Sequence, residues 1–318
     1  MADLTNCKDQ AGQTTGLPDV ASTAIGAPET CAPTAFPGIG SATDCATITQ
    51  NPQTFSGNQG PDKWLLSQNK GGLHGPMIVG NDTKDAQRGG TILSLTAQKA
   101  GIKADQGTTV PRSGRDPQSA HTNIIQQMKA DNSNYSLMTS AASSALELRN
   151  EADLQGLDSS KIIWECVSCY GNTIVTDNAS AFEGEYQFLG FLPFNETKYN
   201  PTLAAFIKYM GKNKPDQFSA YAFESTLAFA DAIKAVVAKD GVNGITRAST
   251  MSAIKSLTDF NAGGMAGTHS FKTGRTTNCF VMSQFQSGKW VRLSPTKKGT
   301  FDCKSSNGVE IKANLLGG

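Results

Sequence analysis

The residues in this chain best suited to chemistry are its cysteines, two of which form a Cys-x-x-Cys motif at Cys166 and Cys169. Such a pair acts as a redox dithiol when its first thiol is activated at the start of a helix, and this pair follows a predicted strand. A zinc site would need two further ligands at metal-binding spacing, and the three histidines are scattered singly. The motif leaves open a thiol oxidoreductase and a small structural loop or disulfide.

The seven cysteines also bear on the compartment. Pairing neighbours along the chain gives Cys31–Cys45, Cys166–Cys169 and Cys279–Cys303, with Cys7 left over. This pairing is an expectation, because connectivity cannot be deduced from sequence alone, and the alternative is seven reduced thiols. Three disulfides would indicate an oxidising, extracytoplasmic setting.

Motifs of other chemistries are missing from the sequence. No Gly-x-Gly-x-x-Gly follows a predicted strand, and the chain contains neither a phosphate-binding P-loop nor a Gly-x-Ser-x-Gly elbow. We therefore expect a protein that is not an enzyme and that uses no cofactor and no metal.

Composition excludes several classes of protein. The 318 residues include 28 basic and 27 acidic side chains, a net charge of +1, whereas nucleic-acid binders carry a basic excess. No apolar run reaches the length of a membrane-spanning helix. The start of the chain has no basic and apolar signal segment, although the cysteines indicate export. Both observations agree if Met1 is not the natural start.

From residue 77 the chain alternates between predicted strands and helices. Strands are predicted at 77–80, 135–139 and 161–165, with helices between them, which indicates βαβ units on a parallel sheet. The order then changes to a proline-bearing strand at 190–194, three helices, and antiparallel strands within 267–293. The three helices are predicted at about 201–210, 218–239 and 247–257. The sequence therefore predicts an α/β fold of two lobes joined by several crossings.

Polar residues follow three of these strands. Thr83, then Thr139 and Ser140, then Tyr170 lie at successive carboxyl ends, where open α/β sheets bind their ligands. Each of them could instead be an ordinary helix cap or a packing residue. Their coincidence favours a ligand crevice.

Several segments together resemble the branched-chain amino acid substrate-binding proteins of ABC transporters, which have the type I periplasmic binding fold. Phe218–Ile233 is similar to a late helix of that family, Gly263–Phe271 to its glycine-rich turn and strand, and Gln286–Arg292 to its terminal hairpin. Leu17–Glu29 is similar to the ligand-contacting loop of its first lobe. The family begins with several further βα units, so this chain resembles a member that lacks its N-terminal portion.

The resemblance implies two lobes, each a parallel sheet flanked by helices, with the first lobe incomplete. The first lobe would comprise 1–75 and 195–272, and the second 76–194 and 273–318. The crossings between the lobes would lie near 73–77, 190–195 and 272–278. The implied ligand-binding residues are Ser22, Thr23, Ala24 and Gly26 from the first lobe and Thr83, Asp85, Gln87, Thr139, Ser140 and Tyr170 from the second.

By this resemblance we expect an extracytoplasmic protein, in the periplasm or lipid-anchored at the cell surface, with no signal peptide in this chain. It would be a monomer that captures a small polar, amino-acid-like solute and delivers it to an ABC permease, and it would bind no nucleic acid. Residues Thr83–Gln87 depart from the family pattern, so the ligand need not be a branched-chain amino acid. Two alternatives stay open, a ligand-sensing ectodomain of the same fold and a thiol oxidoreductase using Cys166 and Cys169.

Overall fold

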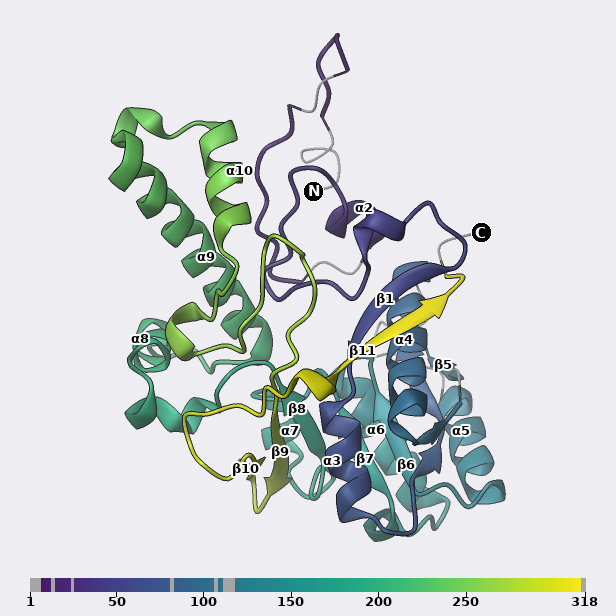
Figure 1. Cartoon of the computed structure of the whole chain (residues 1–318). Coiled ribbons are helices and arrows are strands. Elements are labelled where there is room, and N and C mark those ends of the chain that lie inside the picture. The colour runs from purple at the N-terminus through teal and green to yellow at the C-terminus, as the bar shows by residue number, and fades with distance from the viewer. Residues whose placement is uncertain are drawn as a thin grey trace.

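The structure is a computed structural model that describes residues 7–12, 15–23, 26–80, 83–105, 108–110 and 118–315. Figure 1 shows the central sheet with its covering helices on one side of the molecule and three helices from residues 201–256 grouped on the other. Among the described residues, no helix is both long enough and apolar enough to cross a membrane.

One seven-stranded sheet forms the larger half. Its order is β10 (Lys289–Ser294), β9 (Val281–Gln286), β8 (Tyr186–Leu189), β7 (Ile163–Cys166), β6 (Tyr135–Met138), β3 (Met77–Gly80) and β5 (Thr108–Val110). Strands β5, β3, β6, β7 and β8 are parallel, whereas β9 and β10 are antiparallel to their neighbours. The predicted parallel sheet is therefore confirmed, with an antiparallel hairpin added at one edge.

Helices cover both faces of this sheet. On one face, α3 (Gly60–Gln68) and α4 (Lys84–Ala100) bury Leu65 and Ala97 in a cluster with Met77 and Leu137. On the other, α5 (Gln118–Ala130) and α6 (Ala142–Leu154) pack in a second cluster that contains Met138. Successive strand residues alternate between the two clusters because side chains alternate across a strand.

The remaining elements lie beside the sheet or connect to it. Three long helices, α8 (Pro201–Met210), α9 (Gln217–Asp240) and α10 (Arg247–Ser256), form the smaller half with the N-terminal segment. In that segment the described residues contain the short helix α2 (Ala27–Thr30) and one parallel bridge between Asp19 and Ala35. Strands β1 (Gln53–Asn58) and β11 (Gly308–Ala313) form an antiparallel ribbon between the halves, as Figure 1 shows. The small elements are β2 (His74–Gly75), β4 (Lys103–Ala104) and α7 (Thr173–Asp177).

Two predicted strands differ from the structure. The strand expected at 161–165 begins at Ile163, because Asp158 caps a 3₁₀ turn over Ser159–Lys161. The strand expected at 190–194 is instead an isolated bridge at Phe191 followed by a 3₁₀ helix, while the true strand β8 ends at Leu189. Pro193 supplies no backbone N–H for a sheet, which explains why the apolar run does not extend the strand.

The expected disulfides are present. Cys31 pairs with Cys45, Cys166 with Cys169, and Cys279 with Cys303, while Cys7 is exposed and outside these three bonds. Cys166 and Cys169 are both fully buried. A catalytic dithiol needs a partly exposed, activated thiol, so this placement favours the structural interpretation of the motif.

Candidate functional site

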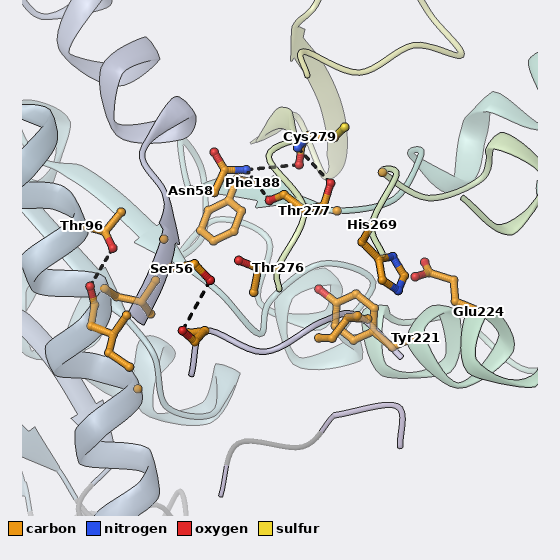
Figure 2. Close-up of a pocket in the computed structure, with 18 residues that line it drawn as sticks. Ser56, Asn58, Thr96, Phe188, Tyr221, Glu224, His269, Thr276, Thr277 and Cys279 are labelled. Carbon is orange, nitrogen blue, oxygen red and sulfur yellow. Dashed lines mark hydrogen bonds between the residues drawn. The ribbon is translucent and has the colours of Figure 1, made fainter. Parts of the chain in front are cut away.

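A pocket of about 300 Å³ lies where the two halves of the molecule meet. Helix α4 forms one wall, β1 and the segment before it form a second, and α9 with the chain at 267–279 forms the third. Figure 2 shows these elements surrounding the pocket. The lining residues are Ile39, Ala42, Ser56, Gly57, Asn58, Gly89, Ile92, Leu93, Thr96, Phe188, Gly190, Tyr221, Glu224, Gly267, His269, Thr276, Thr277 and Cys279.

Close backbone packing holds β1 against α4 at one wall of the pocket. A Cβ atom added at Gly57 would lie 2.2 Å from Thr96 Oγ1, so only glycine permits this approach. Thr96 Oγ1 donates a hydrogen bond to Ile92 O at 2.7 Å, within α4. This wall is therefore rigid, and its hydroxyl is already occupied.

Hydrogen bonds also fix the opposite rim. Asn58 Nδ2 donates to the carbonyl oxygens of Thr277 and Cys279, both at 3.3 Å. Thr277 Oγ1 donates to Thr268 O at 2.8 Å and accepts from Cys279 N at 3.0 Å, a bond drawn in Figure 2. These polar groups hold the segment at 267–279 in place and are satisfied within the protein.

The polar end of the pocket differs from its rim. Glu224 on α9 and His269 are 3% and 7% exposed, and Figure 2 shows their side chains turned toward each other beside Tyr221. Glu224 Oε1 and His269 Nε2 are buried and have no hydrogen-bond partner among the residues that the structure describes. A buried polar atom without a partner costs roughly 1–3 kcal/mol, so an arrangement of this kind is typical of a site that a ligand completes.

Burial dominates the electrostatics at this end. It raises the pKa of Glu224 to about 8 and lowers the pKa of His269. The pKa of Tyr221 is raised, first by burial and then by the neighbouring Glu224. At neutral pH the site therefore holds a mostly protonated carboxyl beside a neutral imidazole.

Glu224→Gln tests this electrostatic state. The folded protein holds the Glu224 proton up to about pH 8, whereas the unfolded chain releases it near its ordinary value, so folding stability falls as pH rises between about 4.5 and 8. We expect the variant to be more stable than the wild type by about 4 kcal/mol at pH 8.5 and nearly equally stable at pH 5, measured by urea unfolding. Glu310→Gln, at an exposed position on β11, is the control. An equal difference in stability between the variant and the wild type at both pH values would contradict the raised pKa of Glu224.

The structure brings some of the predicted binding residues together. A Cβ atom added at Gly26 would lie 2.9 Å from Asp85 Oδ2, so the first-lobe loop touches the start of α4. Thr83 caps this helix by accepting from Ala86 N at 3.1 Å, and Asp85 pairs with Arg88 at 2.6 Å. Gln87 is exposed.

The other predicted residues lie in different surroundings. Ser22 is half-buried and Thr23 is exposed, whereas Ala24 lies outside the described residues. Thr139 Oγ1 donates to Ile78 O at 2.8 Å, and the Ser140 hydroxyl lies 3.5 Å from that of Ser144.

Tyr170 is buried among aromatic rings. Its ring centroid lies 4.9 Å from Phe194 and 5.4 Å from Trp290, and its hydroxyl accepts from Phe194 N at 2.9 Å. Neither Tyr170 nor any other described member of the predicted binding set lines the pocket.

Glu224 and His269 were not predicted as site residues. A sequence signal did exist for Glu224, which falls at four-residue spacing with Ala220, Ala228 and Ala232. Residues four apart share a helix face, and these three alanines are all buried. An acidic residue within an apolar stripe indicates a buried carboxyl that needs a partner. For His269 no comparable pattern exists.

Comparison with known proteins identifies the family. Residues 11–289 match the family model described as periplasmic binding protein. A search of curated protein sequences finds no match. The chain therefore belongs to the periplasmic binding protein family, which comprises solute-binding proteins of ABC transporters rather than enzymes.

Solved structures share the fold at low sequence identity. An ABC transporter substrate-binding protein from Aeropyrum pernix aligns with a TM-score of 0.63 at 13% identity, covering 90% of this chain and 69% of that chain. A branched-chain amino acid ABC transporter protein from Thermus thermophilus with bound valine gives 0.60 at 13%, covering 79% and 66%. A solute-binding protein from R. palustris in complex with benzoate gives 0.59 at 13%, covering 87% and 70%. This chain spans about two thirds of the length of these structures, and their ligands differ in chemistry.

Proposed function

We propose that this chain is an extracytoplasmic receptor that captures a small solute between two lobes and delivers it to an ABC permease. The observation that carries the proposal is the 300 Å³ pocket between the two halves of a periplasmic binding protein fold. A pocket of this volume is at the lower end of those that hold small molecules. Periplasmic binding proteins act outside the cytoplasm, and the three disulfides agree with that setting.

The proposed lobes each contribute to the pocket. With the first lobe at 1–75 and 195–272 and the second at 76–194 and 273–318, Glu224 and His269 come from the first and Ile92 and Phe188 from the second. A solute that touches both lobes would stabilise their closed arrangement. Helix α3 lies within the first of these ranges but packs on the sheet of the second lobe, so we propose that the first crossing lies near β1.

The binding residues predicted from the sequence are also part of this proposal. Asp85 is the best supported of them, because it meets Gly26 across the two halves. We place Ser22, Thr23, Gly26, Thr83, Asp85 and Gln87 at the mouth of the cleft, with Thr139 and Ser140 as supporting hydroxyls. The amino-acid nature of the solute and the monomeric state remain expectations from the family.

A thermal-shift screen tests the proposal directly. A solute present at 100 times its dissociation constant stabilises the folded state by about 2.7 kcal/mol, which corresponds to roughly 5 °C in a protein of this size. We expect one chemical class among amines, amino acids, alcohols and carboxylates to give such a shift with the full chain.

Gly89 offers a pocket-filling control for this screen. It lines the pocket within α4, and a Cβ atom there would meet nothing within 4 Å, so a larger side chain can enter without a backbone clash. Gly89→Phe should remove the shift, whereas Gly89→Ala should retain it and gain helix stability. A folded wild-type protein that no compound stabilises would contradict the proposed function.

A further inference from the structure

The two unpartnered atoms at the polar end of the pocket specify what a ligand must offer. Burial lowers the pKa of His269 while a hydrogen bond to the backbone of Gly267 raises it. The bond to Gly267 therefore uses a ring N–H as donor, and because Nε2 has no partner, that donor is Nδ1. In the neutral ring the other nitrogen, Nε2, is then an acceptor. His269 thus presents a lone pair that needs a donor.

When Glu224 is ionised, it also needs a hydrogen-bond donor. Its Oε1 atom is buried without a partner, and Figure 2 shows the carboxyl group beside the His269 ring at the pocket wall. A buried carboxylate is stable only with a positive charge or several donors nearby. None of the described residues that line the pocket is a lysine or an arginine. The positive charge must therefore come from the ligand.

The same lining argues against an anion at this end. A desolvated carboxylate ligand would face Glu224 with no basic side chain among the lining residues to balance it. The remaining walls are largely apolar, with Ile39, Ile92, Leu93 and Phe188 facing the pocket. They suit a compact hydrocarbon body attached to the polar group.

We propose that the solute carries a primary ammonium group that donates to Glu224 and His269, attached to a small apolar body. This inference rests on the proposed function and specifies its ligand class. A primary ammonium has three N–H donors, enough to satisfy both acceptors at once, whereas a single hydroxyl can donate only once.

Binding of such an amine is linked to pH. Glu224 must lose its proton to pair with the ammonium, so affinity should rise about tenfold per pH unit between pH 6 and 8 and level off above. The titratable groups facing Glu224 are Tyr221 from the same helix and His269 from the opposite segment. Above pH 7 both stay neutral, because burial raises the pKa of Tyr221 and lowers that of His269.

Calorimetric titration with matched compounds tests the inference. The probes are butyl, isoamyl and benzyl bodies, each carrying an ammonium, an alcohol or a carboxylate. For at least one body we expect the amine to bind most tightly. Glu224→Gln should weaken the binding of that amine by about 100-fold, because the buried ion pair is lost. It should change the affinity for the alcohol less than threefold. Asp231 is exposed on the same helix α9, so Asp231→Asn should change neither of these two affinities.

The outcomes separate this inference from the proposed function. If for every body the carboxylate or the alcohol binds more tightly than the amine, or if Glu224→Gln leaves amine affinity unchanged, the ammonium assignment is overturned and the receptor function stands. If the wider screen and these probes all give no binding to the folded protein, both are overturned. The melting temperature of Glu224→Gln shows that the variant is folded before its affinity is interpreted.

Discussion

Arg292→Met is expected to lower the free energy of unfolding by about 3–5 kcal/mol, because it leaves a buried carboxylate unpaired. Arg292 and Glu196 are 5% and 1% exposed, and Arg292 Nη2 donates to Glu196 Oε2 at 2.7 Å. Arg292 Nη1 also donates to the carbonyl oxygens of Pro295, at 3.1 Å, and Thr300, at 2.9 Å. One side chain therefore satisfies three acceptor groups and ties the 3₁₀ helix Phe194–Tyr199, which contains Glu196, to strand β10.

Urea unfolding of three variants measures this effect. Lys234→Met removes an exposed pair with Asp231, at 3.3 Å, and should cost less than about 1 kcal/mol. Adding Glu196→Leu to Arg292→Met should recover part of the loss, because no unpaired charge then remains buried. A cost for Arg292→Met no larger than that of Lys234→Met would show that water reaches Glu196 and that the pair is not structural.

Tyr170→Ala is expected to lower the free energy of unfolding by about 3–5 kcal/mol, because it leaves a cavity in the core. The Tyr170 ring contacts Phe191, Phe194 and Trp290, with centroids 5.7, 4.9 and 5.4 Å away. Tyr170→Phe keeps these contacts but removes the acceptor for Phe194 N, at a cost of roughly 1–3 kcal/mol. The exposed Tyr209→Ala serves as the control.

The Tyr170 variants also decide whether this residue contacts the solute. The sequence predicts that it does, whereas in the structure Tyr170 is buried and is not among the residues that line the pocket. We therefore expect Tyr170→Phe to keep the affinity for any solute found in the screen within about threefold, a change of less than 1 kcal/mol. A tenfold weaker affinity with unchanged stability would return Tyr170 to the binding site.

Local patterns predicted much of the fold correctly. The helix expected at 201–210 occupies those residues as α8, and the hairpin expected at Gln286–Arg292 turns at Ser287 and Gly288, both at positive φ. These features depend on nearby residues, namely the Pro201 start of α8 and a turn glycine. The three disulfides also follow from closeness in sequence, since the longest spans 24 residues.

Which residues line the pocket could not be predicted from local patterns. The ends of successive parallel strands share one edge of a sheet, so the sequence could place Thr139 and Ser140 there without knowing the rest of the fold. It could not show that Thr139 Oγ1 would already donate to Ile78 O, because that partner lies 61 residues away in the sequence. Tyr170 illustrates the same limit, since its aromatic neighbours lie 21 to 120 residues further along the chain.

The sequence by itself determined the fold class and the family and suggested the disulfide pairs, because periodicity, ordered motifs and cysteine spacing are properties of short segments. The tertiary structure alone decided where the pocket lies and which side chains face it. Glu224 and His269 are 45 residues apart, and they meet only because α9 packs beside the returning chain at 267–279. Their raised and lowered pKa values share that origin, since burial is a property of the assembled fold and not of either residue.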